Sequence, residues 1–227
     1  MMERTATVQG RSEARPPGRP LEPAIDVAGL RKDFGDRAAF TGVDLRVEPG
    51  GSVAVLGPNG SGKSTLLRIL AGLLRPSGGE VTVLGCSLPK ETHRLRGRVG
   101  YLGHQPLLYR DLSPRENLEL AAALHGIDPE RAATRVGALL EAVGMSARAD
   151  DRVAELSAGM RQRIDICRAV LHEPQLLLLD EPDAHLDPDA RGRLAPLIAA
   201  GQGRTRVLVS HERGRASEEA DFVLELR

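Results

Sequence analysis

The stretch from Gly51 to Leu74 constrains the fold more than any other part of the chain. It reads GSVAVL, then GPNGSGKST, then LLRILAGLL. The first six residues form a short aliphatic run, which is typical of a strand buried on both faces. The last nine place leucines and Ile69 at spacings that cover a wide face of a helix. A buried strand that passes through a glycine-rich loop into such a helix predicts an α/β fold.

The glycine-rich loop matches the pattern G-x-x-x-x-G-K-[ST]. Its glycines let backbone N–H groups converge on phosphate oxygens, and the following helix directs its positive end toward the same anion. We expect Lys63 to reach the terminal phosphates and Ser64 to hold Mg²⁺. A lysine at this position is informative, because the chain has only Lys32, Lys63 and Lys90. The residues predicted to bind nucleotide here are Gly57, Pro58, Asn59, Gly60, Ser61, Gly62, Lys63, Ser64 and Thr65.

A second acidic site follows another buried run, LLLLDEP at residues 176–182. Asp180 at the strand end is suited to hold Mg²⁺ directly or through water. Glu181 is placed to polarise a water molecule for attack on a γ-phosphate. A lone Asp-Glu pair is usually a solvated turn, but a phosphate loop in the same chain favours the catalytic interpretation.

The remaining chain predicts a mainly parallel sheet interrupted by helices. Further strands are expected in AIDVAGLRKDF, GVDLRVE, EVTVLG, RVGYLG, QLLLLD, TRVLVS and ADFVLELR. Ser113, Pro114 and Glu116 form a capping box with proline at the first helical position, and Asp128 is a second candidate helix cap. We expect an all-helical insert at roughly 104–170.

Composition bounds the class of protein. The 227 residues are 41% hydrophobic and 2% aromatic, which suits one compact domain with an aliphatic core. The net charge of zero gives no indication of nucleic-acid binding. No apolar run reaches the roughly 18 residues of a membrane span. Residues 1–22, rich in Arg, Pro and Gly, predict a disordered tail, so residues 23–227 are expected to form the domain.

These motifs in this order resemble the layout of ATP-binding cassette (ABC) ATPases from about residue 24 to residue 225. The resemblance implies a P-loop NTPase (RecA-like) core with an N-terminal antiparallel β subdomain and an inserted α-helical subdomain. LSAGM takes the place of the family's signature segment, usually Leu-Ser-Gly-Gly-Gln, which binds the γ-phosphate of ATP held by a partner subunit. Ser157, Ala158 and Gly159 are therefore implied to bind ATP across a dimer, with Ala158 and Met160 as departures from the pattern.

The resemblance assigns three further positions. Phe34 takes the place of the aromatic residue that stacks on adenine, although core packing is the simpler interpretation of a phenylalanine. His211, after a buried strand, resembles the family's switch histidine and is implied to act with Glu181 in catalysis. The family also has a glutamine that senses Mg²⁺ after the strand near Tyr101. His104 matches its position, and Gln105, one residue later, matches its chemistry.

The strings YLGHQPLL, LSPRENL and LSAG resemble one branch of the family, the ATP-binding subunits of the haem exporter of cytochrome c biogenesis. The resemblance implies an ATPase that uses ATP and Mg²⁺, works as a pair of cassettes on transmembrane subunits, and lies on the cytoplasmic side of the cell membrane. The apolar run 106–109 is either subdomain core or a docking surface for those subunits. A multidrug or lipid exporter would share the same core. A soluble ABC ATPase is disfavoured, because no second cassette, coiled coil or zinc motif occurs.

Overall fold

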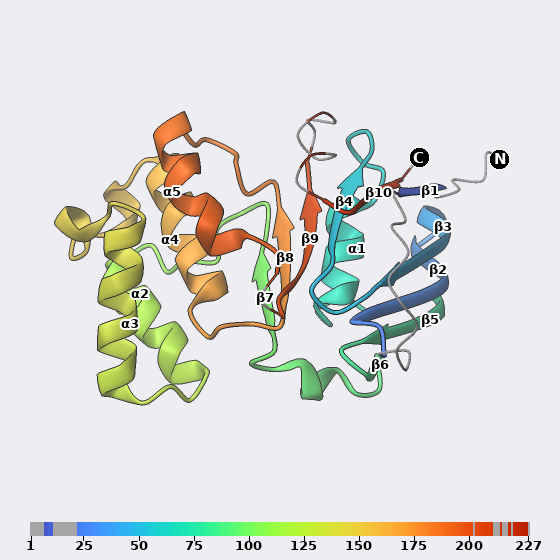
Figure 1. The fold of residues 1–227 in the computed structure, drawn as a ribbon, viewed down its shortest axis with the longest axis horizontal. Helices are drawn as coiled ribbons and strands as arrows, with labels where there is room; N and C mark the ends of the chain where they lie inside the picture. Colours follow the sequence, from blue (N-terminus) through green and yellow to red (C-terminus); the bar gives the residue numbers. More distant parts are fainter. Residues whose placement is uncertain are drawn as a thin grey trace.

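The computed structural model describes residues 7–10, 22–201, 203–210, 214, 218 and 220–226. Its elements form layers: a four-stranded sheet, helix α1 (Lys63–Leu70), a six-stranded sheet, and helices on the far side of that sheet (Figure 1). This arrangement agrees with the predicted α/β fold with an antiparallel subdomain and a helical insert.

The larger sheet has the strand order β1-β10-β4-β9-β8-β7, and every neighbouring pair from β10 to β7 is parallel. Parallel strands bring their carboxyl ends to one edge of a sheet, where the loops that follow them meet. The phosphate loop follows β4, His104 follows β7, and Asp180 ends β8 with Glu181 directly after it. The strands are β1 (Thr7–Gly10), β4 (Ser52–Leu56), β7 (Val99–Leu102), β8 (Leu176–Asp180), β9 (Thr205–Val209) and β10 (Phe222–Glu225).

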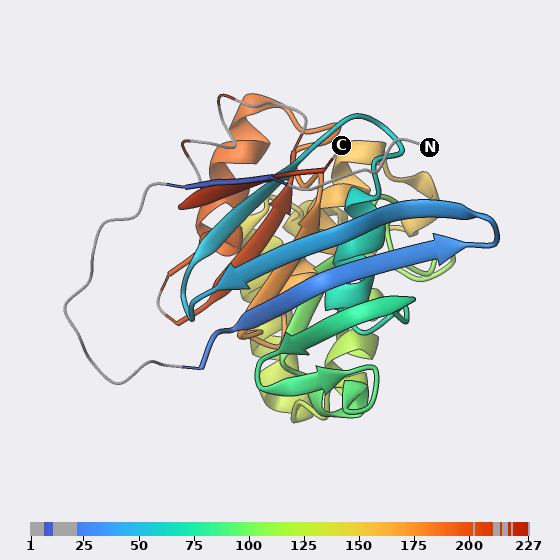
Figure 2. The same cartoon turned by 90° about the vertical axis from the view of Figure 1, so that its right-hand side faces the viewer.

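The smaller sheet is antiparallel with the order β3-β2-β5-β6, and Figure 2 looks onto its outer face. Its strands are β2 (Ile25–Phe34), β3 (Arg37–Val47), β5 (Gly78–Val83) and β6 (Cys86–Leu88). Strand β2 ends at Phe34, so the end of this sheet brings that ring toward the phosphate loop.

Three helices of the insert lie between β7 and β8 and begin at the residues that the sequence predicts. They are α2 (Pro114–Leu124), α3 (Pro129–Ala142) and α4 (Ala158–Val170). Ser113 and Glu116 form the expected capping box, and the Asp128 side chain accepts from two backbone N–H groups of α3. Helix α5 (Pro188–Ile198) follows β8, and short 3₁₀ turns cover Thr92–Leu95, Ser146–Arg148 and Val153–Glu155.

Strand β8 shows how the core is divided. Leu176 and Leu178 pack with α1 and the antiparallel sheet, whereas Leu177 and Leu179 pack with the helices of the insert. All four leucines are fully buried, because a strand covered on both faces needs apolar residues at consecutive positions. None of the helices in the described part of the chain combines the length and the apolar character needed to span a bilayer.

The N-terminal segment departs in part from the prediction of a tail over residues 1–22. Residues 7–10 form β1, which pairs antiparallel with β10 at the edge of the larger sheet (Figure 2). Backbone pairing defines this strand, and an unpaired edge strand accepts such a partner whatever its composition. Residues 1–6 and 11–21 lie outside the described residues.

Candidate functional site

The phosphate loop connects β4 to α1 and depends on glycine at two positions. Gly57 has φ 154° and Gly62 has φ 94°, in the region that side-chain-bearing residues rarely adopt. A Cβ on Gly57 would lie 2.3 Å from the carbonyl oxygen of Leu226, and one on Gly62 would lie 2.5 Å from a ring carbon of Phe40. The loop is therefore held too closely for any larger residue at either position.

Lys63 begins α1 and folds back over the loop. Its Nζ donates to the carbonyl oxygens of Gly57, at 2.8 Å, and Pro58, at 3.0 Å. Burial lowers the pKa of the Lys63 ammonium, while the negative charges of Glu181 and Asp180 act in the opposite direction. A buried ammonium at the N-terminus of a helix is suited to bind a phosphate group.

Two side-chain oxygen atoms near Lys63 and its loop are buried without a hydrogen-bond partner among the described residues. Asp180 is 2% exposed, and its Oδ2 atom has no hydrogen-bond partner among the described residues. The Oγ atom of Ser61, also buried, has none within that part of the chain either. Burial of an unpaired carboxylate oxygen is costly unless a cation compensates it. Asp180 therefore fits a hard divalent cation such as Mg²⁺, and the hydroxyl of Ser64, which lines the pocket described next, is a second candidate ligand.

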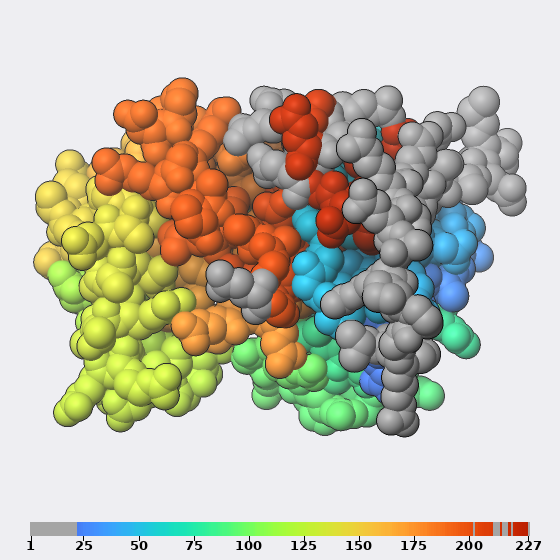
Figure 3. Space-filling view, in the orientation of Figure 1, coloured from blue at the N-terminus to red at the C-terminus, as the bar shows by residue number. Residues whose placement is uncertain are grey.

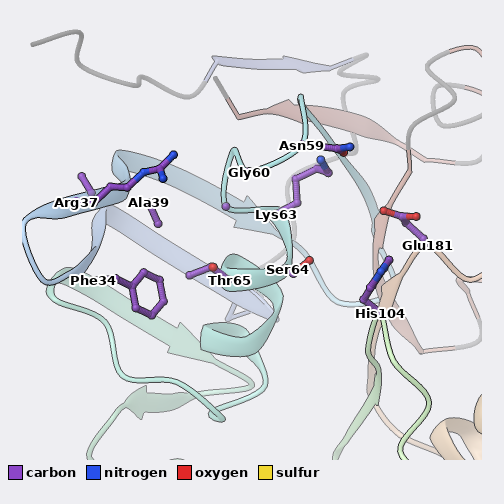
Figure 4. Close-up of a pocket in the computed structure, with 12 residues that line it drawn as sticks. Phe34, Arg37, Ala39, Asn59, Gly60, Lys63, Ser64, Thr65, His104 and Glu181 are labelled. Carbon is purple, nitrogen blue, oxygen red and sulfur yellow. The ribbon is translucent and has the colours of Figure 1, made fainter.

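A pocket of about 650 Å³ joins these elements at the carboxyl edge of the sheet. Figure 4 shows Phe34 on the opposite side of this pocket from His104 and Glu181. The pocket brings together nine of the residues predicted from the sequence: Phe34, Asn59, Gly60, Gly62, Lys63, Ser64, Thr65, His104 and Glu181. Its volume and its wall of both apolar and polar groups suit a nucleotide with its phosphates at Lys63.

The structure separates the two candidates for the Mg²⁺-sensing position. His104 lines the pocket, whereas Gln105 is exposed and is absent from the pocket wall. His104, which matches the family's glutamine by position, thus reaches the pocket, whereas Gln105, which matches it by residue type, does not. His211, the predicted switch histidine, lies outside the described residues, although β9 ends at Val209 beside β8.

The signature-like segment lies away from this pocket. Ser157 caps α4, and its hydroxyl accepts from the backbone N–H of Met160 at 3.3 Å. Ala158 is exposed and Gly159 is partly buried at the same helix end. A Cβ on Gly159 would lie 2.5 Å from the carbonyl oxygen of His185, so glycine is required where α4 meets the turn after β8. None of these residues lines the nucleotide pocket of its own chain.

Hydrogen bonds from the insert hold the segment that carries His104. The Arg168 guanidinium donates to the carbonyl oxygen of Tyr101 at 2.8 Å and pairs with the buried Asp165 carboxyl at 2.6 Å. Burial raises the pKa of Asp165, and the charge of Arg168 opposes that shift. Farther along, the Asn117 amide exchanges hydrogen bonds with both backbone groups of Tyr109, at 2.8 and 3.0 Å. The segment is thus tied to α4 and α2.

Sequence reasoning missed two residues near the site. Arg37, at the start of β3, lines the pocket opposite Glu181, and no motif singles it out. Gln162 is buried, and its Nε2 atom lies 3.2 Å from the carbonyl oxygen of Pro182 and 3.4 Å from that of Glu181. Gln162 lies within the predicted helical insert, where no motif distinguishes it from other polar helix residues.

Comparison with known families places these features in context. A family model described as ABC transporter matches residues 40–184. The daunorubicin resistance ATP-binding protein DrrA3 of Streptomyces coeruleorubidus is 39% identical over 88% of this chain and 64% of its own length. The Nod factor export ATP-binding protein I of Rhizobium meliloti is 38% identical over 86% of this chain and 59% of its own length. The chain thus spans about three fifths of these relatives.

Solved structures give the same result for the fold. The ATP-binding cassette MJ0796, in a dimeric post-hydrolysis state bound to ADP and Pi, superposes with a TM-score of 0.81 at 26% identity. That match covers 89% of this chain and 94% of the other. A structure described as the ATP binding subunit of an ABC transporter also has a TM-score of 0.81, at 30% identity over 90% of this chain and 86% of that one.

Proposed function

Because the chain belongs to the ABC transporter family of ATP-binding domains, we propose that it is the ATP-hydrolysing subunit of an exporter whose pathway is built by separate membrane subunits. The observation that carries the proposal is the convergence of Lys63, Ser64, His104 and Glu181 on one pocket. These groups supply phosphate binding, metal binding and a candidate base at one edge of the sheet.

Each residue has a distinct part in binding and hydrolysis. The phosphate loop and Lys63 bind the phosphates, and Phe34 stacks on the adenine. Ser64 and Asp180 would hold Mg²⁺, which would supply positive charge to the phosphate oxygens. Glu181 orients the attacking water and accepts its proton. His104 hydrogen-bonds a water of the metal site, and His211 contacts the γ-phosphate.

A second copy of the cassette completes the site. Ser157, Ala158 and Gly159 lie at a helix N-terminus, where free N–H groups favour an anion, yet they lie outside the pocket of their own chain. Head-to-tail pairing would place them over the nucleotide of a partner. The dimeric state of the similar cassette MJ0796 supports this arrangement.

A groove beside α1 is the proposed contact with the membrane subunits. It has a volume of about 650 Å³ and is lined by the end of α1, the turn before β7 and the end of α2. Leu73 and Leu124 line it and are 62% and 77% exposed, and Leu107 and Tyr109 of the predicted docking run are also exposed. Figure 3 shows the surface hollowed between the helical lobe and the segment before β7. Binding there would hold the chain at the cytoplasmic face of a membrane.

The names of the relatives indicate which class of compound is exported. The relatives described above are named for daunorubicin resistance and Nod factor export. We therefore favour export of an amphiphilic small molecule or lipid-like compound. The strings YLGHQPLL and LSPRENL keep haem export as the second candidate.

The proposal is tested by purifying the chain from native membranes and identifying the integral membrane proteins that co-purify. Mg²⁺-dependent ATP hydrolysis by that complex, absent in a Lys63→Ala preparation, is the expected result. A complex without ATPase activity, or a chain that binds no membrane protein, would contradict it. Co-purification of cytochrome c assembly proteins would favour haem export over the first candidate.

A further inference from the structure

The aromatic residue of the pocket, Phe34, also has a cation over its ring. The Nζ atom of Lys32 lies 4.9 Å from the centroid of the Phe34 ring. The two residues are two positions apart near the end of β2, where the pairing with β3 is irregular between Lys32 and Asp33. An ammonium at this distance over an aromatic face is attracted by the ring quadrupole.

Lys32 is fixed in place by the segment that leaves α1. Its Nζ donates to the carbonyl oxygen of Arg75 at 3.0 Å. Beside it, the backbone N–H of Asp33 donates to the Ser77 hydroxyl at 3.0 Å, and the backbone N–H of Ser77 donates to the carbonyl oxygen of Arg31 at 2.9 Å. These hydrogen bonds tie the end of β2 to residues 75–77 and hold the Lys32 ammonium. The Phe34 ring remains partly exposed.

Phe34 lines the nucleotide pocket and Lys32 does not. The ring is 54% exposed, so the protein packs only part of its surface and leaves the rest open to a ligand. Figure 4 shows the ring on the side of the pocket where Thr65 lies, away from Glu181. The cation and the pocket thus meet different parts of the same ring.

We infer that Lys32 is a positioning residue for the nucleobase, acting through the Phe34 ring. The inference rests on the proposed function, in which Phe34 stacks on adenine. The ammonium restrains the ring and draws its π density toward one face. Repulsion between that ring and the π cloud of a base on the free face is thereby reduced. Lys32 contributes to binding of the base and leaves binding of the phosphates unchanged.

The experiment measures binding of the base and binding of the phosphates separately. Calorimetric titration of the full chain compares Mg²⁺–ATP with Mg²⁺–tripolyphosphate, a probe that has no base. The variants are Lys32→Ala, Lys32→Arg, Phe34→Ala and the double variant, with Lys90→Ala as a matched lysine removal at an exposed position after β6. A cooperative thermal unfolding transition in each variant serves as the test that the variant is folded.

We expect Lys32→Ala to weaken ATP binding about two- to fivefold, the range of an exposed cation–π contact. Tripolyphosphate binding should be unchanged, Lys32→Arg should retain wild-type affinity, and Lys90→Ala should have no effect. In the Phe34→Ala background, removal of Lys32 should cause no further loss, because the two residues act as one unit.

Three results would overturn the inference. They are equal weakening of ATP and tripolyphosphate, losses that add in the double variant, and wild-type ATP affinity in Lys32→Ala. If Phe34→Ala also binds ATP like the wild type, the stacking role fails but ATP binding stands. If the wild-type chain binds neither ligand, the proposed function fails together with the inference.

Discussion

The side-chain amide of Gln162 donates to the backbone carbonyl oxygen of Pro182 at 3.2 Å, which ties helix α4 to the turn that carries Glu181. Glu181 itself has φ 53°, in the left-handed region that is unfavourable for a residue with a side chain. The amide therefore helps to stabilise a strained backbone beside the proposed base. The same helix is capped by Ser157, so the signature-like segment and the proposed base are parts of one connected unit.

Replacement of Gln162 tests this connection. Gln162→Glu keeps the volume of the side chain but cannot donate, because a carboxylate only accepts hydrogen bonds. We expect kcat for ATP hydrolysis to fall about tenfold in Gln162→Glu, since small displacements of catalytic groups are costly, with little change in ATP affinity. The kcat of Gln162→Ala should fall by a similar factor. Wild-type turnover in folded Gln162→Glu would show that the hydrogen bond does not position Glu181.

Glu181→Gln should separate ATP binding from hydrolysis. The amide cannot accept the proton of the attacking water, so turnover should fall by about 10²- to 10⁴-fold while ATP still binds. Size-exclusion chromatography with Mg²⁺–ATP should then show an ATP-bound dimer that persists. Lys63→Ala is the control, because it should lose ATP binding and remain monomeric. Undiminished ATPase activity with the membrane partners would remove Glu181 from the role of base.

His104 and Gln105 can be compared directly. Because only His104 lines the pocket, His104→Ala should reduce Mg²⁺-dependent hydrolysis about ten- to a hundredfold, the effect of losing a hydrogen bond in a charged site. Gln105→Ala should stay near the wild-type rate. Steady-state rates over a series of Mg²⁺ concentrations measure both. A larger loss of rate in Gln105→Ala than in His104→Ala would mean that the segment carrying both residues rearranges when nucleotide binds.

A stacked histidine pair makes stability depend on pH. The rings of His125 and His172 lie 3.9 Å apart between centroids, and the Nε2 atom of His172 lies 3.1 Å from the carbonyl oxygen of Val99. Burial, together with the nearby His125 and Arg168, lowers the pKa of His172 to about 4. The folded protein therefore keeps His172 neutral at pH values where the unfolded chain, with a pKa of about 6.5, takes up a proton.

The sign of this effect follows from the two pKa values. The contribution of His172 to stability is fully present above about pH 6.5 and is lost as the pH falls toward about 4. Urea unfolding at pH 7.5, 6 and 5 should show the free energy of unfolding decreasing with pH. In His172→Gln, which can still donate to Val99, the decrease should be smaller. An identical pH profile in the variant would assign the dependence to other groups.

The phosphate loop and the acidic pair could be predicted from the sequence because each follows a local pattern, whereas Arg37 of the same pocket belongs to no motif. The glycines and Lys63 form one contiguous motif, and Asp180 and Glu181 directly follow an apolar strand. Parallel pairing then brings these loops to one edge, so knowledge of strand type alone predicts that they meet. The helix caps at Ser113 and Asp128 were predictable for the same reason, since capping depends on residues three or fewer positions away.

Contacts between distant segments could not be predicted in this way. Nothing in the sequence indicates that Gln162 reaches Pro182, that Arg168 reaches Tyr101, or that Lys32 is tied to Arg75, because each contact depends on how two elements pack. The pairing of residues 7–10 with β10 was missed for a related reason. A strand at a sheet edge is specified by its partner's free backbone groups, and its own composition carries little signal.

The contact between Gly57 and Leu226 has a consequence for how the chain is made. The backbone N–H of Leu226 donates to the carbonyl oxygen of Leu56 at 2.9 Å, so the phosphate loop rests on residues near the end of the described chain. A ribosome releases the loop long before it releases this support. ATP stabilises only states that bind it. A nascent chain therefore gains no stabilisation from a bound nucleotide until Leu226 has also been synthesised.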